Sequence, residues 1–463
     1  MIKIILTTLF SFVILCNIAT SQTLNDQQLT TEIDELLSIQ FKTNEPGAEI
    51  LIARKGQVFY KKAFGMANLE LDIPMKPDMV FRIGSLSKQF TAVAILQLVE
   101  QGKLSLQDEI TKFIPDYPMQ VQHITIEHLL THTSGIKAYT SMNTVSEIRR
   151  KDMKPKEVID FFKNEPMDFE PGTKWKYNNS GYFLLGYIIE VITGKPYSAY
   201  LEDAFIKPLG LSNTYYGSDI RIIKNRVGAY DKDKDSFVNA EMMSMTIPYA
   251  GGAIQSTVAD LFKWYQALLD YRLLKKETLD QAFKSYVLSD GKFANYGYGW
   301  FQGSIQKSAT LEHTGSINGF RTMELYLPEE HVFIALFSNC YCNPRPVELV
   351  SKIAALCIGK PYDFTKIPIN NDELKSYAGM YTSESGQQQL ITEENNQLYL
   401  HLNGGGDKIK INSYQKDKFN IENSLSTLEF VRDKNNKIER IFFKARVSTG
   451  KQDDAVWNKN NKE

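Results

Sequence analysis

The stretch FRIGSLSKQF, residues 81–90, holds a serine and a lysine one helical turn apart, at Ser85 and Lys88. Positions i and i+3 of a helix lie on one face, so these two side chains can meet. A lysine whose charged form is disfavoured by burial can take the proton of a neighbouring hydroxyl, which turns an unreactive alcohol into a nucleophile. The Ser-x-x-Lys spacing occurs five more times in the chain, for instance at Ser134 and Lys137, so only its surroundings can single out Ser85.

The residues that follow Ser85 have helical periodicity. Apolar side chains from Phe90 to Val99 form one face, and the pattern ends at Gly102. The pattern predicts a helix that begins at Ser85. The main-chain N–H of Ser85 would then lie at the positive end of the helix, where it can stabilise a negative charge.

Length, composition and charge limit the classes of function. A chain of 463 residues is long enough for two or three domains, and 43% hydrophobic with 23% charged residues is typical of a globular protein. The net charge of −1 and the lack of a basic stripe interleaved with aromatic residues argue against nucleic acid as a partner.

The first 21 residues have the pattern of a secretory signal peptide. Lys3 precedes a short apolar run, and small residues end at Ser21. The run is shorter than the roughly 20 residues of a membrane span, so no transmembrane segment is expected in the mature chain. Lipoprotein anchoring at Cys16 is disfavoured because Leu15 precedes it. We expect export to the periplasm or the medium.

Three cysteines remain after the signal peptide, at Cys340, Cys342 and Cys357. This odd count excludes a fully paired disulfide framework. Cys357 lies in an apolar helical pattern typical of a core residue, although a bridge from Cys342 to Cys357 stays open. No Cys/His cluster has the spacing of zinc ligands, and we expect no metal and no organic cofactor.

Two hairpins and the helices between them indicate the architecture of the first domain. Residues 48–68 alternate around Lys55-Gly56, and two further strand patterns in residues 322–338 meet at Pro328. The intervening segments, among them a helix expected over 124–136, and residues 346–359 are helical in pattern. We therefore expect an α/β domain over 22–365, in which N- and C-terminal strands share one antiparallel sheet.

From about Asp372 the chain consists of short strand patterns separated by turn signals at regular intervals. This spacing predicts a separate all-β domain over residues 366–463, either a small barrel of lipocalin-like type or a sandwich.

Two further segments carry chemical groups that acyl transfer requires. Tyr177-Asn178-Asn179 precedes a helical pattern, and a nearby cation would lower the pKa of the tyrosine and make it a base. The segment 313–316, His-Thr-Gly-Ser, precedes the late hairpin, and its glycine allows a substrate to approach the strand closely. His128 and His132 have metal-ligand spacing, but a structural role at a buried helix end is the favoured interpretation.

Five blocks occur in this order: FRIGSLSK, ITIEHLLTHTSGI, YNNSGYFLLGYIIEVITGKPY, YGYGW and HTGSINGF. Together they resemble the serine β-lactamase and penicillin-binding-protein superfamily, in its class C β-lactamase-like branch, over roughly residues 30–360. The resemblance implies an antiparallel sheet flanked by helices, with an all-helical subdomain. It also implies a hydrolase, since the branch includes D-Ala-D-Ala carboxypeptidases, D-aminopeptidases and esterases.

The resemblance assigns roles to nine residues. It makes Ser85 the acylated nucleophile, Lys88 its proton partner and Tyr177 the general base or proton relay. It makes the main-chain N–H groups of Ser85 and Ser316 the oxyanion hole. The expected substrate contacts are Asn179, His313, Thr314, Gly315, Ser316 and Asn318.

One position departs from the family pattern. His313 stands where most relatives carry a lysine, and an unperturbed histidine is mostly uncharged at neutral pH. This weakens the hold on a substrate carboxylate, although Arg321 could supply a charge. We predict a secreted serine hydrolase of D-amino-acid peptides, with small esters next and β-lactams last. The alternative is a weakly catalytic protein that binds or senses cell-wall peptides.

Overall fold

The computed structural model describes residues 26–460, except 119–122, 219, 344–345, 402–407 and 447–451. The predicted signal peptide, residues 1–21 with Cys16, lies outside the described residues. Within the described ranges, no helix combines the length and the apolar character that a membrane span requires.

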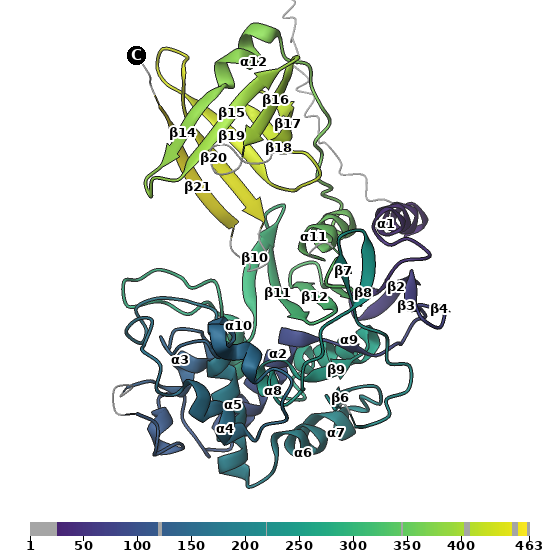
Figure 1. Cartoon of the computed structure of the whole chain (residues 1–463), viewed down its shortest axis with the longest axis vertical. Coiled ribbons are helices and arrows are strands. Elements are labelled where there is room, and N and C mark those ends of the chain that lie inside the picture. The colour runs from purple at the N-terminus through teal and green to yellow at the C-terminus, as the bar shows by residue number, and fades with distance from the viewer. Residues whose placement is uncertain are drawn as a thin grey trace, which may run out of the picture.

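The first domain is built on a six-stranded antiparallel sheet in the order β10-β11-β12-β13-β1-β2 (Figure 1). Strand β1 near the N-terminus pairs with β13, with Ala48 opposite Ser338, so distant segments share one sheet as predicted. The strands are β1 (Ala48–Arg54), β2 (Gln57–Phe64), β10 (Phe301–Ile305), β11 (Ser308–Ile317), β12 (Phe320–Leu327) and β13 (Val332–Ser338).

Helices cover both faces of this sheet, so its central strands are apolar on both sides. In β1, Ile50 and Ile52 pack against α1 and α11, whereas Leu51 and Ala53 face the core shared with α2 and α9. The helices named here are α1 (Asp26–Gln40), α2 (Ser87–Glu100), α9 (Val258–Leu269) and α11 (Pro346–Cys357). The two apolar sets hold the sheet between layers.

The segment between β2 and β10, which includes α2 and α9, forms the largely helical part of the domain. Its other helices are α3 (Ile126–Leu130), α4 (Pro155–Phe162), α5 (Asn179–Thr193), α6 (Tyr197–Leu201), α7 (Lys207–Leu209), α8 (Tyr249–Gly252) and α10 (Lys276–Phe283). Its short strands are β3 (Met66–Asn68), β4 (Ile73–Pro74), β5 (Phe81–Arg82), β6 (Tyr215–Tyr216), β7 (Tyr230–Asp233), β8 (Ser236–Asn239) and β9 (Ile254–Ser256).

The C-terminal domain is a closed eight-stranded barrel, which decides between the two predicted β architectures. Helix α12 (Asn371–Tyr377) precedes the barrel. Figure 1 shows the barrel and α12 at the end of the molecule opposite to α4 and α6. The barrel strands are β14 (Gly379–Ser383), β15 (Gln388–Glu394), β16 (Gln397–His401), β17 (Lys408–Gln415), β18 (Lys418–Ile421), β19 (Thr427–Arg432), β20 (Ile438–Arg446) and β21 (Gln452–Lys459).

One side chain of the first domain ties the barrel to α11. The carboxylate of Glu348 accepts hydrogen bonds from the hydroxyl of Ser424 (2.7 Å) and from the main-chain N–H of Leu425 (3.2 Å). These two donors belong to the loop between β18 and β19, so the barrel is attached on the α11 side of the sheet.

Several local predictions need correction. The helix that follows Ser85 begins at Ser87, and Ser85 itself lies in a 3₁₀ turn over Gly84–Leu86. The stretch 124–136 is helical only over Ile126–Leu130, because His132 takes a left-handed conformation with φ of 61°. Helix α1 lies in a region for which we predicted no element.

The disulfide joins Cys340 to Cys342, so the bridge between Cys342 and Cys357 that the sequence left open does not form. Cys357 is a buried free cysteine, as its helical pattern predicted.

Candidate active site

The 3₁₀ turn that carries Ser85 is fixed between two strands. Ile83 donates its N–H to the carbonyl of Ile254 in β9 (3.0 Å) and accepts a hydrogen bond from the Thr322 hydroxyl of β12 (2.9 Å). The turn therefore cannot move without breaking contacts to both strands. Ser85 stays half-buried at its surface, where a substrate can reach the hydroxyl.

The Lys88 side chain is completely buried beneath Ser85. Its Nζ lies 3.0 Å from Ser85 Oγ, 2.9 Å from Asn179 Oδ1 and 2.8 Å from the carbonyl oxygen of Gly251. Burial holds the pKa of the Lys88 ammonium well below its ordinary value. The residues described around it therefore favour a neutral amine.

The three contacts of Lys88 match a neutral amine in number and kind. A carbonyl oxygen and an amide oxygen can only accept, so the two N–H groups of the amine go to Gly251 and Asn179. The remaining lone pair then faces Ser85 Oγ at 3.0 Å. This arrangement prepares Lys88 to accept the proton of the serine hydroxyl, as the spacing in residues 81–90 predicted.

Tyr177 lies beside the same pair, with its ring centroid 4.9 Å from Lys88 Nζ and its hydroxyl hydrogen-bonded to Ser85. Burial raises the pKa of Tyr177, and the hydrogen bond to Ser85 offsets only part of that rise. The sequence interpretation of Tyr177 as a phenolate is therefore wrong. A protonated tyrosine at this place is an acid, able to donate its proton to a leaving group.

The segment Tyr177-Asn178-Asn179 is held by His132. Nδ1 of His132 accepts the N–H of Asn178 (3.1 Å), and the ring centroid of His132 lies 4.4 Å from that of Tyr177. Asn178 caps helix α5 by accepting the N–H of Gly181 (3.1 Å). His132 thus has a structural role, as the favoured interpretation of the sequence had it.

His128 has a separate task from His132. It completes a capping box with Thr125 at the start of α3, and its Nδ1 accepts the N–H of Thr125 (3.2 Å). The two histidines therefore do not form one metal-binding face. Among the described residues, no three His, Cys, Asp or Glu side chains are grouped as metal ligands.

Strand β11 passes so close to the serine turn that two glycines are required. A Cβ on Gly315 would lie 2.1 Å from the carbonyl oxygen of Ile83, and one on Gly84 would lie 2.9 Å from the main-chain nitrogen of Ser316. Gly84 also has φ of +53°. The nitrogen of Ser316 is thereby held next to the residue that precedes the nucleophile.

This part of β11 has a free edge on the side of the serine turn. Strand β10 pairs only with residues 308–312 of β11, whereas β12 pairs with residues 311–317 on the other side. In the described ranges no strand continues β10 along residues 313–317. Main-chain groups at Ser316 are therefore placed where an extended substrate can bind them.

His313 is a buried neutral acceptor in this structure. Its Nδ1 lies 2.7 Å from the carbonyl oxygen of Thr314, which can only accept, so Nδ1 carries the proton. Its Nε2 then accepts the hydroxyl proton of Tyr296 (3.1 Å). Burial is the main cause that lowers the pKa of His313 to about 3, so the ring carries no charge at neutral pH.

The remaining predicted site residues lie along the same strand. Thr314 is half-buried, Ser316 is exposed, and Asn318 donates its side-chain N–H to the carbonyl oxygen of Glu241 (2.9 Å). Arg321 alternates with Thr322 along β12 and lies 4.6 Å from the ring centroid of Tyr341. Because side chains alternate along a strand, Arg321 lies on the opposite face of β12 from Thr322, whose hydroxyl binds the serine turn.

Three groups of the site were missed by sequence reasoning. The carbonyl of Gly251 holds Lys88, the hydroxyl of Tyr296 holds His313, and the hydroxyl of Thr140 receives the amide N–H of Asn179 (3.0 Å). Tyr296 belongs to the YGYGW block, which was the one available signal. A main-chain carbonyl such as that of Gly251 has no signature in a sequence.

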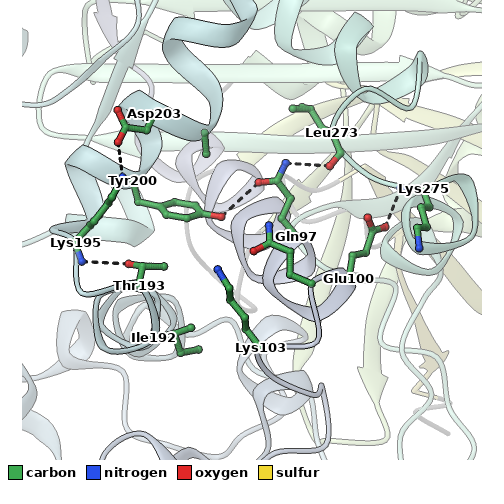
Figure 2. A pocket seen from close by; sticks show the side chains of 12 residues that line it. Gln97, Glu100, Lys103, Ile192, Thr193, Lys195, Tyr200, Asp203, Leu273 and Lys275 are labelled. Carbon is green, nitrogen blue, oxygen red and sulfur yellow. Dashed lines mark hydrogen bonds and ion pairs between the residues drawn. The ribbon is translucent and has the colours of Figure 1, made fainter.

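A separate hollow of about 610 Å³ lies at the other end of α2 (Figure 2). Some of the polar groups drawn there bind one another: Lys195 pairs with Asp203 (2.7 Å), and Gln97 donates to the carbonyl of Leu273 (3.0 Å). At 1.5 Å per residue the hollow is about 20 Å from the serine turn, so it is not part of the site.

Comparison with known proteins agrees with this geometry. The family model described as "Beta-lactamase" matches residues 27–352, which is more than half of the chain. The chain belongs to the beta-lactamase family. Residues 365–459 match a second model, a domain of unknown function named DUF3471. This beta-lactamase family protein is 30% identical to penicillin-binding protein 4* of Bacillus subtilis (strain 168) over 378 residues, 77% of the chain and 83% of that protein.

Solved structures extend the likeness. The octameric penicillin-binding protein homologue from Pyrococcus abyssi has a TM-score of 0.65 at 26% identity, over 94% of this chain and 100% of that one. The D-amino acid amidase from Ochrobactrum anthropi SV3, complexed with D-phenylalanine, has a TM-score of 0.62 at 26% identity, over 71% and 98% of the two chains. The protein is a serine hydrolase of the beta-lactamase and penicillin-binding-protein family.

Proposed function

We propose that this serine hydrolase cleaves amide bonds in peptides or amides of D-amino acids through an acyl-enzyme on Ser85. The observation that carries the proposal is the lone pair of a neutral Lys88 facing Ser85 Oγ at 3.0 Å. A binding protein has no need of a desolvated base in contact with a serine, so the arrangement favours an enzyme over a sensor.

In the acylation step, Ser85 Oγ attacks the substrate carbonyl carbon while its proton passes to Lys88 Nζ. The negative charge that develops on the carbonyl oxygen is bound by the N–H groups of Ser85 and Ser316. The carbon–nitrogen bond then breaks, and the leaving amine takes the proton of the Tyr177 hydroxyl. The ammonium of Lys88 returns a proton to Tyr177, so the site ends neutral with Ser85 acylated.

In the deacylation step, a water molecule takes the place of the leaving amine. Lys88 takes one proton of this water, passed on through the Tyr177 hydroxyl, as the oxygen attacks the acyl carbon, and the same two N–H groups bind the oxyanion. Cleavage of the bond between the acyl carbon and Ser85 Oγ releases the acid, and Lys88 then returns this proton to Oγ.

The choice of D-amino-acid substrates rests on the relatives and on His313. The solved D-amino acid amidase is a structural neighbour, and penicillin-binding protein 4* is a relative in sequence. The neutral ring of His313 leaves β11 without the cation that would hold the carboxylate of a β-lactam. We rank D-amino-acid amides and peptides first, small esters second and β-lactams third.

A panel of paired substrates tests this proposal. The pairs are D- and L-alanyl and D- and L-phenylalanyl amides, with p-nitrophenyl acetate and nitrocefin for the other two classes. The expected result is a kcat/KM for the D-amides that exceeds the L-amides and nitrocefin. Ser85→Ala is the control that removes turnover. Equal rates for D and L forms, or turnover in Ser85→Ala, would contradict the proposal.

Export is part of the same proposal, since the substrates named here are constituents of the cell envelope. The pattern of residues 1–21 supports it. Fractionation of the producing cells, with N-terminal sequencing of the isolated protein, is the test. A mature chain that begins near residue 22 outside the cytoplasm is expected, and an intact N-terminus in the cytoplasm would contradict it.

A further inference from the structure

A second cavity lies just beyond the end of β11, on the side away from His313. It has a volume of about 340 Å³ and begins at Asn318, two residues beyond Ser316. Its wall is apolar at Val227, Met243 and Phe320. At about 3.3 Å per residue, Asn318 lies roughly 7 Å past Ser316 along the strand, within the reach of a substrate bound at Ser85.

Two arginines line this cavity and come from adjacent segments. Val80 donates its N–H to the carbonyl of Asn225 (3.0 Å), and Val227 donates to the carbonyl of Val80 (3.2 Å). These two hydrogen bonds hold the segments that carry Arg82 and Arg226 side by side. Arg82 also precedes the nucleophile by only three residues, so its backbone is fixed relative to Ser85.

The cavity keeps an excess of positive charge. Glu241 is the acid among its lining residues, and its carboxylate is already paired with Arg149 (2.7 Å) and Arg150 (3.2 Å). The main-chain carbonyl of Glu241 is held by Asn318, which fixes this wall of the cavity. Arg226 donates from Nη1 to the neutral main-chain carbonyl of Ser218 (3.2 Å), so its positive charge stays beside the apolar wall, in an environment suited to an anion.

The position of the proton donor decides which part of a substrate reaches the cavity. The leaving group must lie at Tyr177, which is near His313: their ring centroids are 6.1 Å apart. Asn318 comes five positions after His313, just past the end of β11, which is about 16 Å of extended chain. The acyl part of the substrate, which stays on Ser85, therefore extends towards Asn318 and the two arginines.

We propose that this cavity is an acyl-side subsite for a carboxylate, so that the preferred substrates carry an anionic group on the acyl side of the scissile bond. The proposal rests on the proposed function, because it places the acyl group on Ser85. It also defines the class of substrate. These substrates are D-amino-acid amides in which a short chain on the amino group ends in a carboxylate.

The test compares two p-nitroanilides that differ in one group, N-succinyl-D-alanine p-nitroanilide and its neutral isostere with a succinamoyl group. We expect the kcat/KM of the wild type to favour the succinyl compound by about tenfold or more, as a hydrogen-bonded ion pair would. Arg226→Gln should reduce this ratio by about tenfold, because it weakens an ion pair with the succinyl compound but only a hydrogen bond with the neutral one. Arg82→Gln should lower the same ratio.

Arg221→Gln is the matched control, since Arg221 lies 4.6 Å from the ring centroid of Tyr215 and does not line the cavity. It should leave the ratio unchanged. A wild-type ratio near one, or a ratio that survives both Arg82→Gln and Arg226→Gln, would overturn the subsite.

Binding to Ser85→Ala separates the subsite from the reaction. Calorimetry should show tighter binding of the succinyl than of the succinamoyl compound, and Arg226→Gln in the same background should remove the difference. Equal binding overturns the subsite whether or not the wild type turns over either compound. Tighter binding of the succinyl compound without any turnover would overturn the proposed hydrolysis and keep the subsite.

Discussion

Strand β11 has a free edge over part of its length, whereas every strand of the C-terminal barrel is paired on both sides. Residues 313–317 of β11 pair with β12 on one side only, and the serine turn lies against their free edge. In the barrel, β14 pairs with β21 and closes the ring. A free edge with fixed main-chain donors can bind a substrate, whereas a closed ring leaves no edge for one. The catalytic groups of this chain are collected at the free edge.

The largest loss of activity is expected from changing Lys88, the buried base beside the free edge of β11. Lys88→Arg keeps a positive charge at every pH, because a guanidinium does not lose its proton in proteins. It therefore cannot accept the Ser85 proton, and we expect kcat to fall by about a thousandfold. Steady-state kinetics on a D-amino-acid amide measure this. Lys195→Arg, on the exposed pair with Asp203, is the matched control. A Lys88→Arg enzyme with near-normal kcat would contradict a neutral Lys88.

The next largest loss of activity is expected from adding a side chain at Gly315, where β11 contacts the serine turn. A side chain on Gly315 would collide with the main chain of Ile83, so Gly315→Val must push β11 away from Ser85. A displacement of about 1 Å costs roughly a hundredfold in rate. The kcat/KM of Gly315→Val and Gly102→Ala should be compared, since Gly102 has no neighbour within 4 Å of its Cβ position. Equal activity of the two variants would show that the edge does not position the substrate.

A smaller effect is expected at His313, and it concerns pH. The folded pKa of His313 is about 3 and the unfolded value about 6.5, so the unfolded chain takes up the proton first and stability falls as the pH drops from 6.5 towards 3. His313→Gln should weaken this acid destabilisation. It should lower kcat/KM by no more than about tenfold, through the lost bond to Tyr296.

The pH profile of kcat/KM tests whether His313 is neutral in the working enzyme. Because the ring stays neutral throughout, the profile between pH 5 and 8 should keep its shape in His313→Gln. The disappearance of an ionisation near pH 6.5 in the variant would mean that His313 carries charge in the working enzyme.

The smallest effect on activity is expected in the barrel. Leu398 is fully buried in its core, so Leu398→Ala should cost about 2 to 5 kcal/mol of local stability. The kcat/KM should remain within a factor of about two, because the barrel closes on itself and is attached through Glu348 of α11. Thermal unfolding and kinetics on one preparation measure both. A tenfold loss of kcat/KM would show that the barrel contributes to the site.

Much of the fold was readable because its signals are local. The alternation in residues 48–64 and 322–338 predicted both hairpins, and the helical period after Ser85 predicted α2. The helix expected over 124–136 failed because His132 leaves helical geometry to bind Asn178 through Nδ1. That contact spans 46 residues, so no local pattern contains it.

The sequence predicted the Ser85 and Lys88 pair, but it did not predict the charge states of Tyr177 and His313. The spacing of Ser85 and Lys88, with the order of the other blocks, led to the pair that the structure brings to 3.0 Å. The predicted phenolate at Tyr177 was wrong because burial depends on residues distant in the chain, such as Phe301 and His313. The neutral state of His313 likewise follows from burial, which no pattern around residue 313 contains.

Intact-mass spectrometry of the protein after reaction with a fluorophosphonate tests the central claim most directly. The account predicts one adduct at neutral pH, mapped to Ser85 by peptide analysis, absent from Ser85→Ala and formed far more slowly by Lys88→Arg. An adduct that persists in Ser85→Ala, or one that forms equally fast in Lys88→Arg, would contradict it.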